Sequence, residues 1–160
     1  MKKLSGLFLS LVLFVGCFGN AVFAQETTYP KVTHVYTSTE DYASDDWSVD
    51  QRGMYLGNGT SSITREDSTH INISGSTIAT RTCDKVKLVL YVEQSASYAT
   101  GYSTYKTYTY NAEDVYSLAK EIANIKVDKG YYYRVADVHS VTHNGVTETN
   151  NSVTDPIDYR

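Results

Sequence analysis

Cysteine, positive charge and long hydrophobic runs are all scarce in this sequence. Its net charge of −4 argues against a dedicated nucleic-acid-binding protein, which would carry a basic patch or stripe. With 160 residues the chain fits one domain and is too short for a multidomain cofactor enzyme. Hydrophobic residues make up 41% of the chain and charged residues 20%, so the chain can build a core and is not disordered overall.

The one long apolar run lies at the N-terminus and is typical of an export signal. Lys2 and Lys3 precede an apolar segment at residues 7–15, and Val22-Phe23-Ala24 suits a signal peptidase. We therefore expect a signal peptide at residues 1–24. The apolar segment is too short for a membrane span and no second one follows, so we expect a secreted chain without a transmembrane segment.

A second cleavage site is present within the same segment. Residues 14–17 resemble a lipobox, after which Cys17 would carry a lipid and anchor the protein to a membrane. Under either cleavage Cys83 has no partner for an intramolecular disulfide, so stability must come from the core. We expect Cys83 to be a small buried residue, with a reactive thiol or an intermolecular disulfide as alternatives.

The predicted signal contains every phenylalanine of the chain. The remaining sequence therefore relies on tyrosine, with 15 in the whole chain, and on Trp47. Tyrosine supplies apolar area and keeps a polar tip, which suits half-buried strands.

Residues 25–50 have few aliphatic side chains and carry six acidic residues against one lysine. We expect a flexible acidic leader, with residues 32–36 as a possible short strand. Its aspartates could gather around calcium, but no D-x-D-x-D-G loop is present, so a solvated leader is favoured. These aspartates are Asp41, Asp45, Asp46 and Asp50.

Residues 51–160 read as an all-β domain, rich in threonine, valine, isoleucine and tyrosine. Short strands are predicted at residues 62–65, 70–74 and 76–81, with a bulge or bend at Gly75-Ser76 because Ile78 changes parity. The clearest strand is residues 85–93, where Val86, Leu88, Leu90 and Val92 alternate with mostly polar residues. Residues 102–110 return from it.

Residues 113–127 are ambiguous between helix and strand. Val115, Leu118, Ala119, Ile122 and Ile125 have helical spacing, whereas Ala119, Ala123, Ile125 and Val127 can share one strand face. We favour a strand because of the motif that follows.

That motif, Val127 to Val135, resembles a tyrosine corner of fibronectin type III-like and immunoglobulin-like β-sandwiches. Val127 would end a strand, Gly130 would close the turn, and Tyr133 would bond back across the corner. The resemblance implies a single antiparallel sandwich with strands at residues 116–127, 131–143 and 146–153. Asn144-Gly145 predicts a two-residue hairpin between the last two strands.

Asp137 departs from this pattern, since the next inward position after Val135 should be apolar. A bulge after Val135 would instead turn Ala136 and Val138 inward.

Four different motifs follow one another between residues 52 and 155. They are residues 52–56, 59–63, 71–77, and 130–135 with His139. Through them the body resembles an uncharacterised domain-of-unknown-function family of small secreted proteins from Gram-positive bacteria. The resemblance implies export and a β domain, and it transfers no activity or site.

No motif indicates catalysis, and we expect no enzyme, cofactor or metal. His139 and His143 would lie about 13 Å apart on a strand, too far for one ion, and they are expected to be surface or hairpin residues. No P-loop, dinucleotide fingerprint or G-x-S-x-G elbow is present. The three Asn-x-Ser/Thr sequons carry no expected role.

The best functional lead is a tyrosine-rich strand. Tyr102, Tyr108 and Tyr110 share a strand face, and we expect Tyr91 on the neighbouring strand to add to them. An exposed tyrosine surface offers large contact area at low entropic cost and would suit an extracellular protein or glycan. We therefore expect a non-enzymatic binding module that uses this face or the loops at one end. The alternatives are an inhibitor or immunity-type protein acting through a loop, and a hydrolase with Cys83 or a serine beside a histidine.

Overall fold

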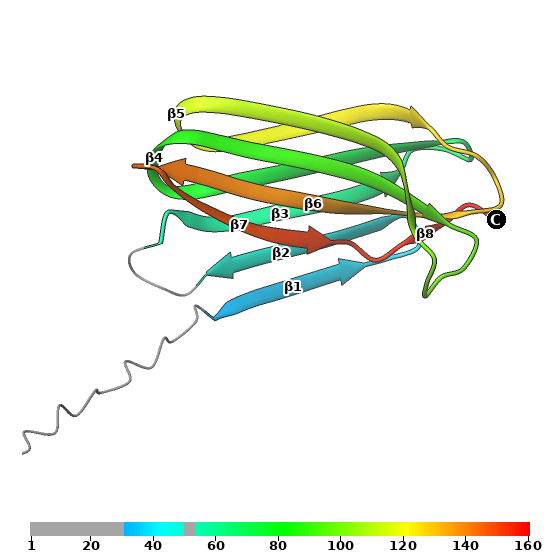
Figure 1. The fold of residues 1–160 in the computed structure, drawn as a ribbon. Coiled ribbons are helices and arrows are strands. Elements are labelled where there is room, and N and C mark those ends of the chain that lie inside the picture. Colours follow the sequence, from blue (N-terminus) through cyan, green and yellow to red (C-terminus); the bar gives the residue numbers. More distant parts are fainter. Residues whose placement is uncertain (1–30, 50–53) are drawn as a thin grey trace, which may run out of the picture.

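The computed structural model describes residues 31–49 and 54–160, and these residues form an all-β, antiparallel fold (Figure 1). The predicted signal peptide and Cys17 lie outside the described residues. Within these described residues, eight strands form one hydrogen-bonded sheet. They are β1 (Val32–Ser38), β2 (Tyr42–Val49), β3 (Leu56–Arg65), β4 (His70–Ser95), β5 (Ser103–Lys126), β6 (Tyr132–His143), β7 (Val146–Val153) and β8 (Ile157–Asp158). No helix occurs in this described part of the chain, and thus none that could cross a membrane.

The long hairpin of β4 and β5 organises the sheet. The first half of β4 pairs with β3, its second half pairs with β6, and β5 follows it along nearly its whole length. The sheet curls strongly, so that β3 and the start of β4 face β6. Figure 1 shows the β4–β5 hairpin arching along the top, β1 and β2 along the bottom, and β6 and β7 between them. The prediction of an all-β antiparallel fold is confirmed. The expected separate strand at residues 116–127 is instead the continuation of the return strand, within β5.

The inner face of the sheet holds two hydrophobic clusters with polar residues between them. The alternation predicted at residues 85–93 is confirmed, since Val86, Leu88, Leu90 and Val92 are all buried. Along β6, Val135 belongs to one cluster and Val141 to the other. The inward positions between them on β3, β4, β6 and β7 are polar. We call this buried set the polar waist: Ser61, Thr77, Asp137, His139 and Ser152.

The short strand expected at residues 32–36 is present within β1, but the flexible leader expected around it is wrong for residues 42–49, which form β2 within the same sheet. Ala43, Asp45 and Trp47 alternate inward and are buried. Asp45 is tolerated there because its carboxylate accepts a hydrogen bond from the Val153 backbone N–H (2.8 Å) and lies 2.9 Å from His34 Nδ1. The solvated reading of this aspartate is therefore also wrong. Residues 25–30 and 50 lie outside the described part.

The bulge predicted at Gly75-Ser76 is absent from the β3–β4 register. Gly75 and Thr77 point inward and Ile78 points outward. The parity argument failed because an apolar residue was assumed to mark the core face, whereas the waist places a threonine there.

The strand predicted at residues 113–127 is confirmed, with a different inner face. Ile122 and Ile125 point toward the core, whereas Ala119 and Ala123 are exposed. Ile71 and Ile73 of β4 pair with Ile125 and Ile122, so β5 carries one extra residue there. Asn124, at φ 56°, lies in this bulge. Because of the extra residue, Ile122 and Ile125 point to the same face although they are three positions apart, a spacing that is otherwise typical of a helix.

Two turn predictions are confirmed. Asn144 and Gly145 adopt φ values of 50° and 77° in the β6–β7 hairpin, as a type I′ turn requires. At the corner, Val127 is buried and Gly130 has φ 96°. The Tyr133 hydroxyl accepts from the Asp128 N–H (2.9 Å) and lies 3.1 Å from the Asp128 carbonyl oxygen.

The bulge expected after Val135 is wrong. The β4–β6 register runs without a shift from Lys85 to Ser95, so Asp137 points inward and is buried, while Ala136 and Val138 point outward. The side chain is accommodated because Gly75 stands opposite it.

Candidate functional site

The predicted tyrosine face is split by the pleat of the sheet. Tyr108 and Tyr110 pair with Leu90 and Leu88, so they lie on the inner face and pack against a hydrophobic cluster. Tyr91 is on the opposite face. The prediction of one exposed surface is therefore wrong for these residues. Residues directly opposite each other on β4 and β5 lie on the same face of the sheet. Even-numbered residues of β4 point toward the core here, so their even-numbered partners Tyr108 and Tyr110 point toward the core too.

Tyr102 differs from the other three because it lies at the end of the sheet, as the last residue of the β4–β5 loop. Its hydroxyl donates to the Tyr98 carbonyl oxygen at 2.9 Å. The Arg134 guanidinium lies 3.9 Å from the centre of the Tyr102 ring, close enough for a cation–π contact. Arg134 Nε in turn donates to the Glu93 carboxylate at 2.7 Å. The ring is thus covered on one side by an arginine that a carboxylate holds in place.

A second arginine–tyrosine pair stands beside the same loop. Tyr98 is 56% exposed and meets the Tyr132 ring edge-to-face, with centroids 5.5 Å apart and an interplanar angle of 83°. The Arg160 guanidinium lies 4.3 Å from the Tyr132 ring centre. Asp158 accepts two hydrogen bonds from the Arg160 side chain, at 3.0 and 2.9 Å, and one from its backbone N–H at 2.8 Å. Both arginines are therefore oriented by an acidic neighbour before any partner arrives.

The buried tyrosine of the corner supports this region from beneath. Tyr133 is fully buried and contacts Tyr105, Tyr131 and Tyr159 edge-to-face, with centroids 5.6, 6.4 and 5.8 Å away. Burial raises the pKa of Tyr159 to about 12, so its hydroxyl stays protonated. We call this cluster the tyrosine end, and its members are Tyr98, Tyr102, Tyr105, Tyr131, Tyr132, Tyr133 and Tyr159.

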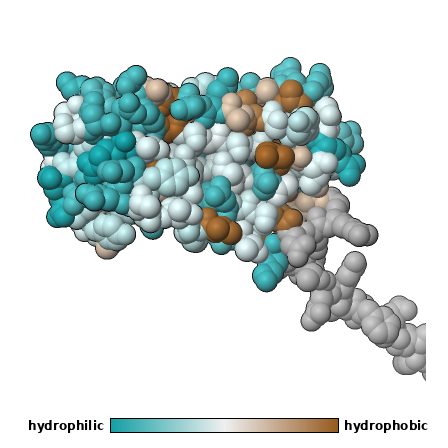
Figure 2. Space-filling view, turned by 180° about the vertical axis from the view of Figure 1, so that it is seen from behind, coloured by the Kyte–Doolittle hydropathy of each residue, from teal (hydrophilic) through white to brown (hydrophobic). Residues whose placement is uncertain are grey.

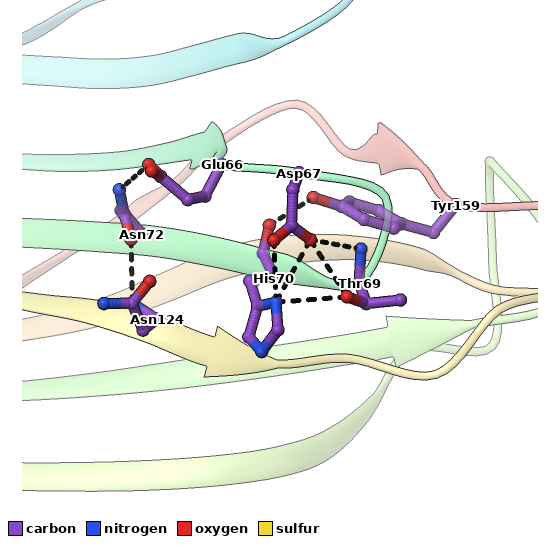
Figure 3. A network of polar contacts seen from close by, with 7 residues as sticks. All are labelled: Glu66, Asp67, Thr69, His70, Asn72, Asn124 and Tyr159. Carbon is purple, nitrogen blue, oxygen red and sulfur yellow. Dashed lines mark hydrogen bonds and ion pairs between the residues drawn. The ribbon is translucent and has the colours of Figure 1, made fainter.

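Polar contacts hold the adjoining β3–β4 turn in place (Figure 3). The Asp67 carboxylate accepts from the Thr69 N–H at 2.6 Å, and this bond lowers the Asp67 pKa. The Tyr159 hydroxyl donates to the His70 carbonyl oxygen at 2.7 Å. Asn72 completes the link to the end of β5 by accepting from the Asn124 N–H at 2.9 Å. The turn, the C-terminal segment and β5 are thus tied together at the same end of the sheet.

The polar waist contains a serine–histidine pair, the feature that a hydrolase would need. His139 Nε2 lies 2.8 Å from Ser152 Oγ, and its Nδ1 lies 3.0 Å from Thr77 Oγ1. Burial lowers the His139 pKa to about 4. His139 and Ser152 are at most 1% exposed, so no substrate reaches the serine in this conformation. The waist is therefore an internal structural layer.

Asp137 stands apart from that pair. Neither carboxyl oxygen has a hydrogen-bond partner among the described residues, and burial raises its pKa well above the ordinary value. The expectation that His139 is a surface residue is wrong, since the ring is completely buried against Trp47. His143 is half-buried, 3.3 Å from an Asp84 oxygen.

The other residues singled out in the sequence give no reactive site. Cys83 is 1% exposed, as expected for a small buried residue, and burial is the main cause of its raised pKa. Within residues 31–49 and 54–160, no group of three or more histidine, cysteine, aspartate or glutamate side chains is arranged to hold a metal ion. Figure 2 shows one face of the molecule, where hydrophobic residues appear as separate spots on a pale and hydrophilic surface.

The tyrosine end could have been found only in part from the sequence. The run 131–133 and the corner motif indicated one segment of it. The other parts come from distant segments of the chain, and no local sequence pattern indicates them. They are Arg134, Arg160, the β4–β5 loop and Tyr159. The loops at one end were a stated alternative to the tyrosine face, and the structure gathers the aromatic residues there.

These observations define a small all-β domain with a rigid aromatic end. Comparison with known families matches residues 22–156 to DUF6147, a family of unknown function. The chain belongs to this family. Among curated proteins no match was found.

Proposed function

We propose that this protein is an exported, non-enzymatic binding module that recognises a partner protein through its tyrosine end. Export is supported by the pattern of residues 1–24. Binding is supported chiefly by one observation, the pairing of Arg134 with Tyr102 and of Arg160 with Tyr132 in positions set by carboxylates. Tyrosine and arginine dominate the residues that carry binding energy in protein interfaces.

Preorganisation strengthens this argument. Ordering a flexible side chain on binding costs about 0.5–1.5 kcal/mol. Six rings of the tyrosine end already make edge-to-face contacts, Tyr102 is covered by Arg134, and hydrogen bonds hold the loop that carries Tyr98. Ser95 Oγ donates to the Thr100 carbonyl oxygen at 2.6 Å and accepts from the Ser97 N–H at 3.0 Å. A partner would therefore lose little affinity to ordering.

A protein partner fits this geometry better than a glycan. The Tyr98 and Tyr132 rings are nearly perpendicular, at 83°, and do not form a flat platform on which a sugar ring would lie. The two exposed members of the cluster, Tyr98 and Tyr131, suit the mixed apolar and hydrogen-bonding contacts of a protein surface.

The rigid β4–β5 loop also favours a narrower second candidate, an inhibitor that inserts this loop into one enzyme or toxin. The exposed Tyr98 would be its leading side chain. This candidate predicts that shortening residues 96–101 abolishes binding, whereas substitution of Arg160 leaves it nearly unchanged.

The test compares Tyr98→Ser/Tyr102→Ser with Tyr116→Ser in crosslinking and affinity capture from the extracellular fraction, beside a glycan array. Tyr116 is 61% exposed on β5 and serves as a matched control. We expect one protein to be captured by the native chain and by Tyr116→Ser, and to be lost with the double variant. A glycan whose binding is lost in the double variant and kept in Tyr116→Ser would show that the partner is a glycan and not a protein. The proposal would be overturned if a ligand bound equally well to the double variant, or if neither the capture experiment nor the glycan array found any ligand.

A further inference from the structure

Within the described residues, four strands pair on one side only: β1, β5, β7 and the two-residue β8. Of the three longer ones, two are protected against pairing with another chain. In the described structure β5 pairs only with β4, but it carries charges along its length and two residues of positive φ, Asp114 and Asn124. Charges and bulges are the usual protection of an exposed edge. The charged residues of β5 are Lys106, Glu113, Asp114, Lys120, Glu121 and Lys126.

The second outer strand, β7, is folded back against β2 and β3. The Asp45 carboxylate occupies the Val153 N–H at 2.8 Å. Glu148 of β7 accepts hydrogen bonds from the N–H groups of Tyr55 and Leu56, at 2.8 and 2.7 Å. This edge therefore meets acidic side chains and neighbouring backbone in place of open solvent.

The third outer strand, β1, has none of these protections. Its seven residues, VTHVYTS, include no lysine, glutamate, aspartate, proline or glycine. Its register with β2 contains no bulge. Val35 and Tyr36 are 58% and 59% exposed. Within residues 31–49 and 54–160, β2 is its only partner strand. A flat, uncharged and exposed edge of this kind is a template for strand addition.

The residues around β1 indicate what occupies this edge. Lys31 precedes the strand, and Glu40 and Asp41 follow it. Asp41 is already ion-paired with Arg65 of its own chain, so Glu40 is the acidic residue that counts here. Antiparallel pairing of two β1 strands would bring Lys31 of each copy near Glu40 of the other, and these charges attract. Parallel pairing would set like charges side by side, which is unfavourable.

The side chains of β1 are also self-complementary about its centre. Pairing centred on Val35 sets Val35 against its symmetry mate, Thr33 against Thr37 and His34 against Tyr36. His34 and Tyr36 already stack within one strand, with ring centroids 5.7 Å apart and planes 9° from parallel. The dimer would extend this stack to four rings. A twofold contact of this kind satisfies both edges at once.

We propose that β1 is a homodimer interface, in which the β1 strands of two copies pair antiparallel about Val35 into one continuous sheet. The inference is independent of the tyrosine end. Because the twofold axis reverses the strand direction, the tyrosine ends of the two copies point in opposite directions in this dimer.

Two experiments test the dimer. In sedimentation velocity, the native protein is expected at twice the monomer mass and Val35→Lys at the monomer mass, because two lysines would face each other across the axis. Val146→Lys, at a 50% exposed position of β7, is the control and should remain dimeric. A native protein that is monomeric at high micromolar concentration, or a Val35→Lys protein that stays dimeric, would overturn the proposal.

Cysteine crosslinking tests the register. Residues directly opposite in an antiparallel pair have Cα atoms about 4.5–5.5 Å apart, within disulfide range. Val35→Cys should therefore form a covalent dimer on mild oxidation. Thr33→Cys should not, because its own symmetry mate would lie about 13 Å away along the strand. A mixture of Thr33→Cys and Thr37→Cys should crosslink. Failure of Val35→Cys to crosslink, or crosslinking of Thr33→Cys alone, would contradict the arrangement.

Discussion

Gly75 and Asp137 face each other across the interior of the curled sheet, and the missing side chain at Gly75 leaves room for the Asp137 carboxyl. A Cβ atom on Gly75 would lie 2.5 Å from Asp137 Oδ2, closer than side-chain atoms approach without a shift. Leu90 and Leu88 would meet the same atom at 3.2 and 3.3 Å. The buried carboxyl therefore fits only because the facing strand has no side chain at that position.

The first prediction follows from this contact. Gly75→Ala should lower the free energy of unfolding by about 1–3 kcal/mol, the range for an overpacked core. In an Asp137→Ser background the same substitution should cost less, because the blocking oxygen is gone. Urea denaturation of the four proteins in this cycle gives the coupling. Equal costs in both backgrounds would show that Asp137 is not the obstacle.

The second prediction concerns the charge of Asp137. Burial raises its pKa in the folded protein, so the folded state holds its proton to higher pH than the unfolded state does. Stability contributed by this group is present below the unfolded pKa of 3.8 and is lost as pH rises through the folded value. Asp137→Asn should thus be at least as stable as the native protein at pH 7, and its advantage should shrink as the pH falls toward 3.8 and then level off. Glu121→Gln, an exposed change on β5, should show no such trend.

His139 should have the opposite pH dependence. Its pKa falls from 6.5 to about 4 on folding, so the unfolded chain takes up a proton first and stability is lost as pH falls from 6.5 toward 4. This difference corresponds to about 3 kcal/mol. His139→Gln should flatten the stability profile in that window, measured by urea denaturation at several pH values. Tyr116→Phe, at a 61% exposed position of β5, should leave the slope in place.

The corner tyrosine should contribute through its hydroxyl. Tyr133→Phe removes the bond to the Asp128 N–H and the contact with Gln94 Oε1 at 3.2 Å. We expect a loss of about 1–3 kcal/mol, because a partly buried donor is left unpaired. Thermal unfolding measures the loss, and Tyr116→Phe at an exposed position should leave the midpoint unchanged. A similar midpoint for both variants would argue against a structural corner.

Asp45 should stabilise the closure of the curled sheet. Asp45→Ala removes the partner of the Val153 N–H and of His34. We expect a loss of about 1.5–3 kcal/mol, as for hydrogen bonds to a charged group, together with faster amide exchange at Val153. Asp46→Ala, on the neighbouring and less buried position, should have a smaller effect on both readouts.

The sequence by itself determined the features that depend on near neighbours. Alternation at residues 85–93 defined a core strand, Asn144-Gly145 defined a hairpin, and Gly130 with Tyr133 defined the corner. Each of these depends on backbone conformation or strand parity, which a few adjacent residues set.

Only the tertiary structure decided the rest, because it depends on contacts between distant segments. Asp45 belongs to a segment whose sequence predicts an acidic leader. It is nevertheless buried, because its carboxylate contacts His34 and accepts a hydrogen bond from the Val153 N–H. Asp137 points inward because Gly75, 62 residues earlier in the chain, leaves it room. The tyrosine end exists because the sheet curls and brings the β4–β5 loop, the corner and Tyr159 together. Hydropathy describes a residue alone, whereas the free energy of burying it is set by the neighbours that folding supplies.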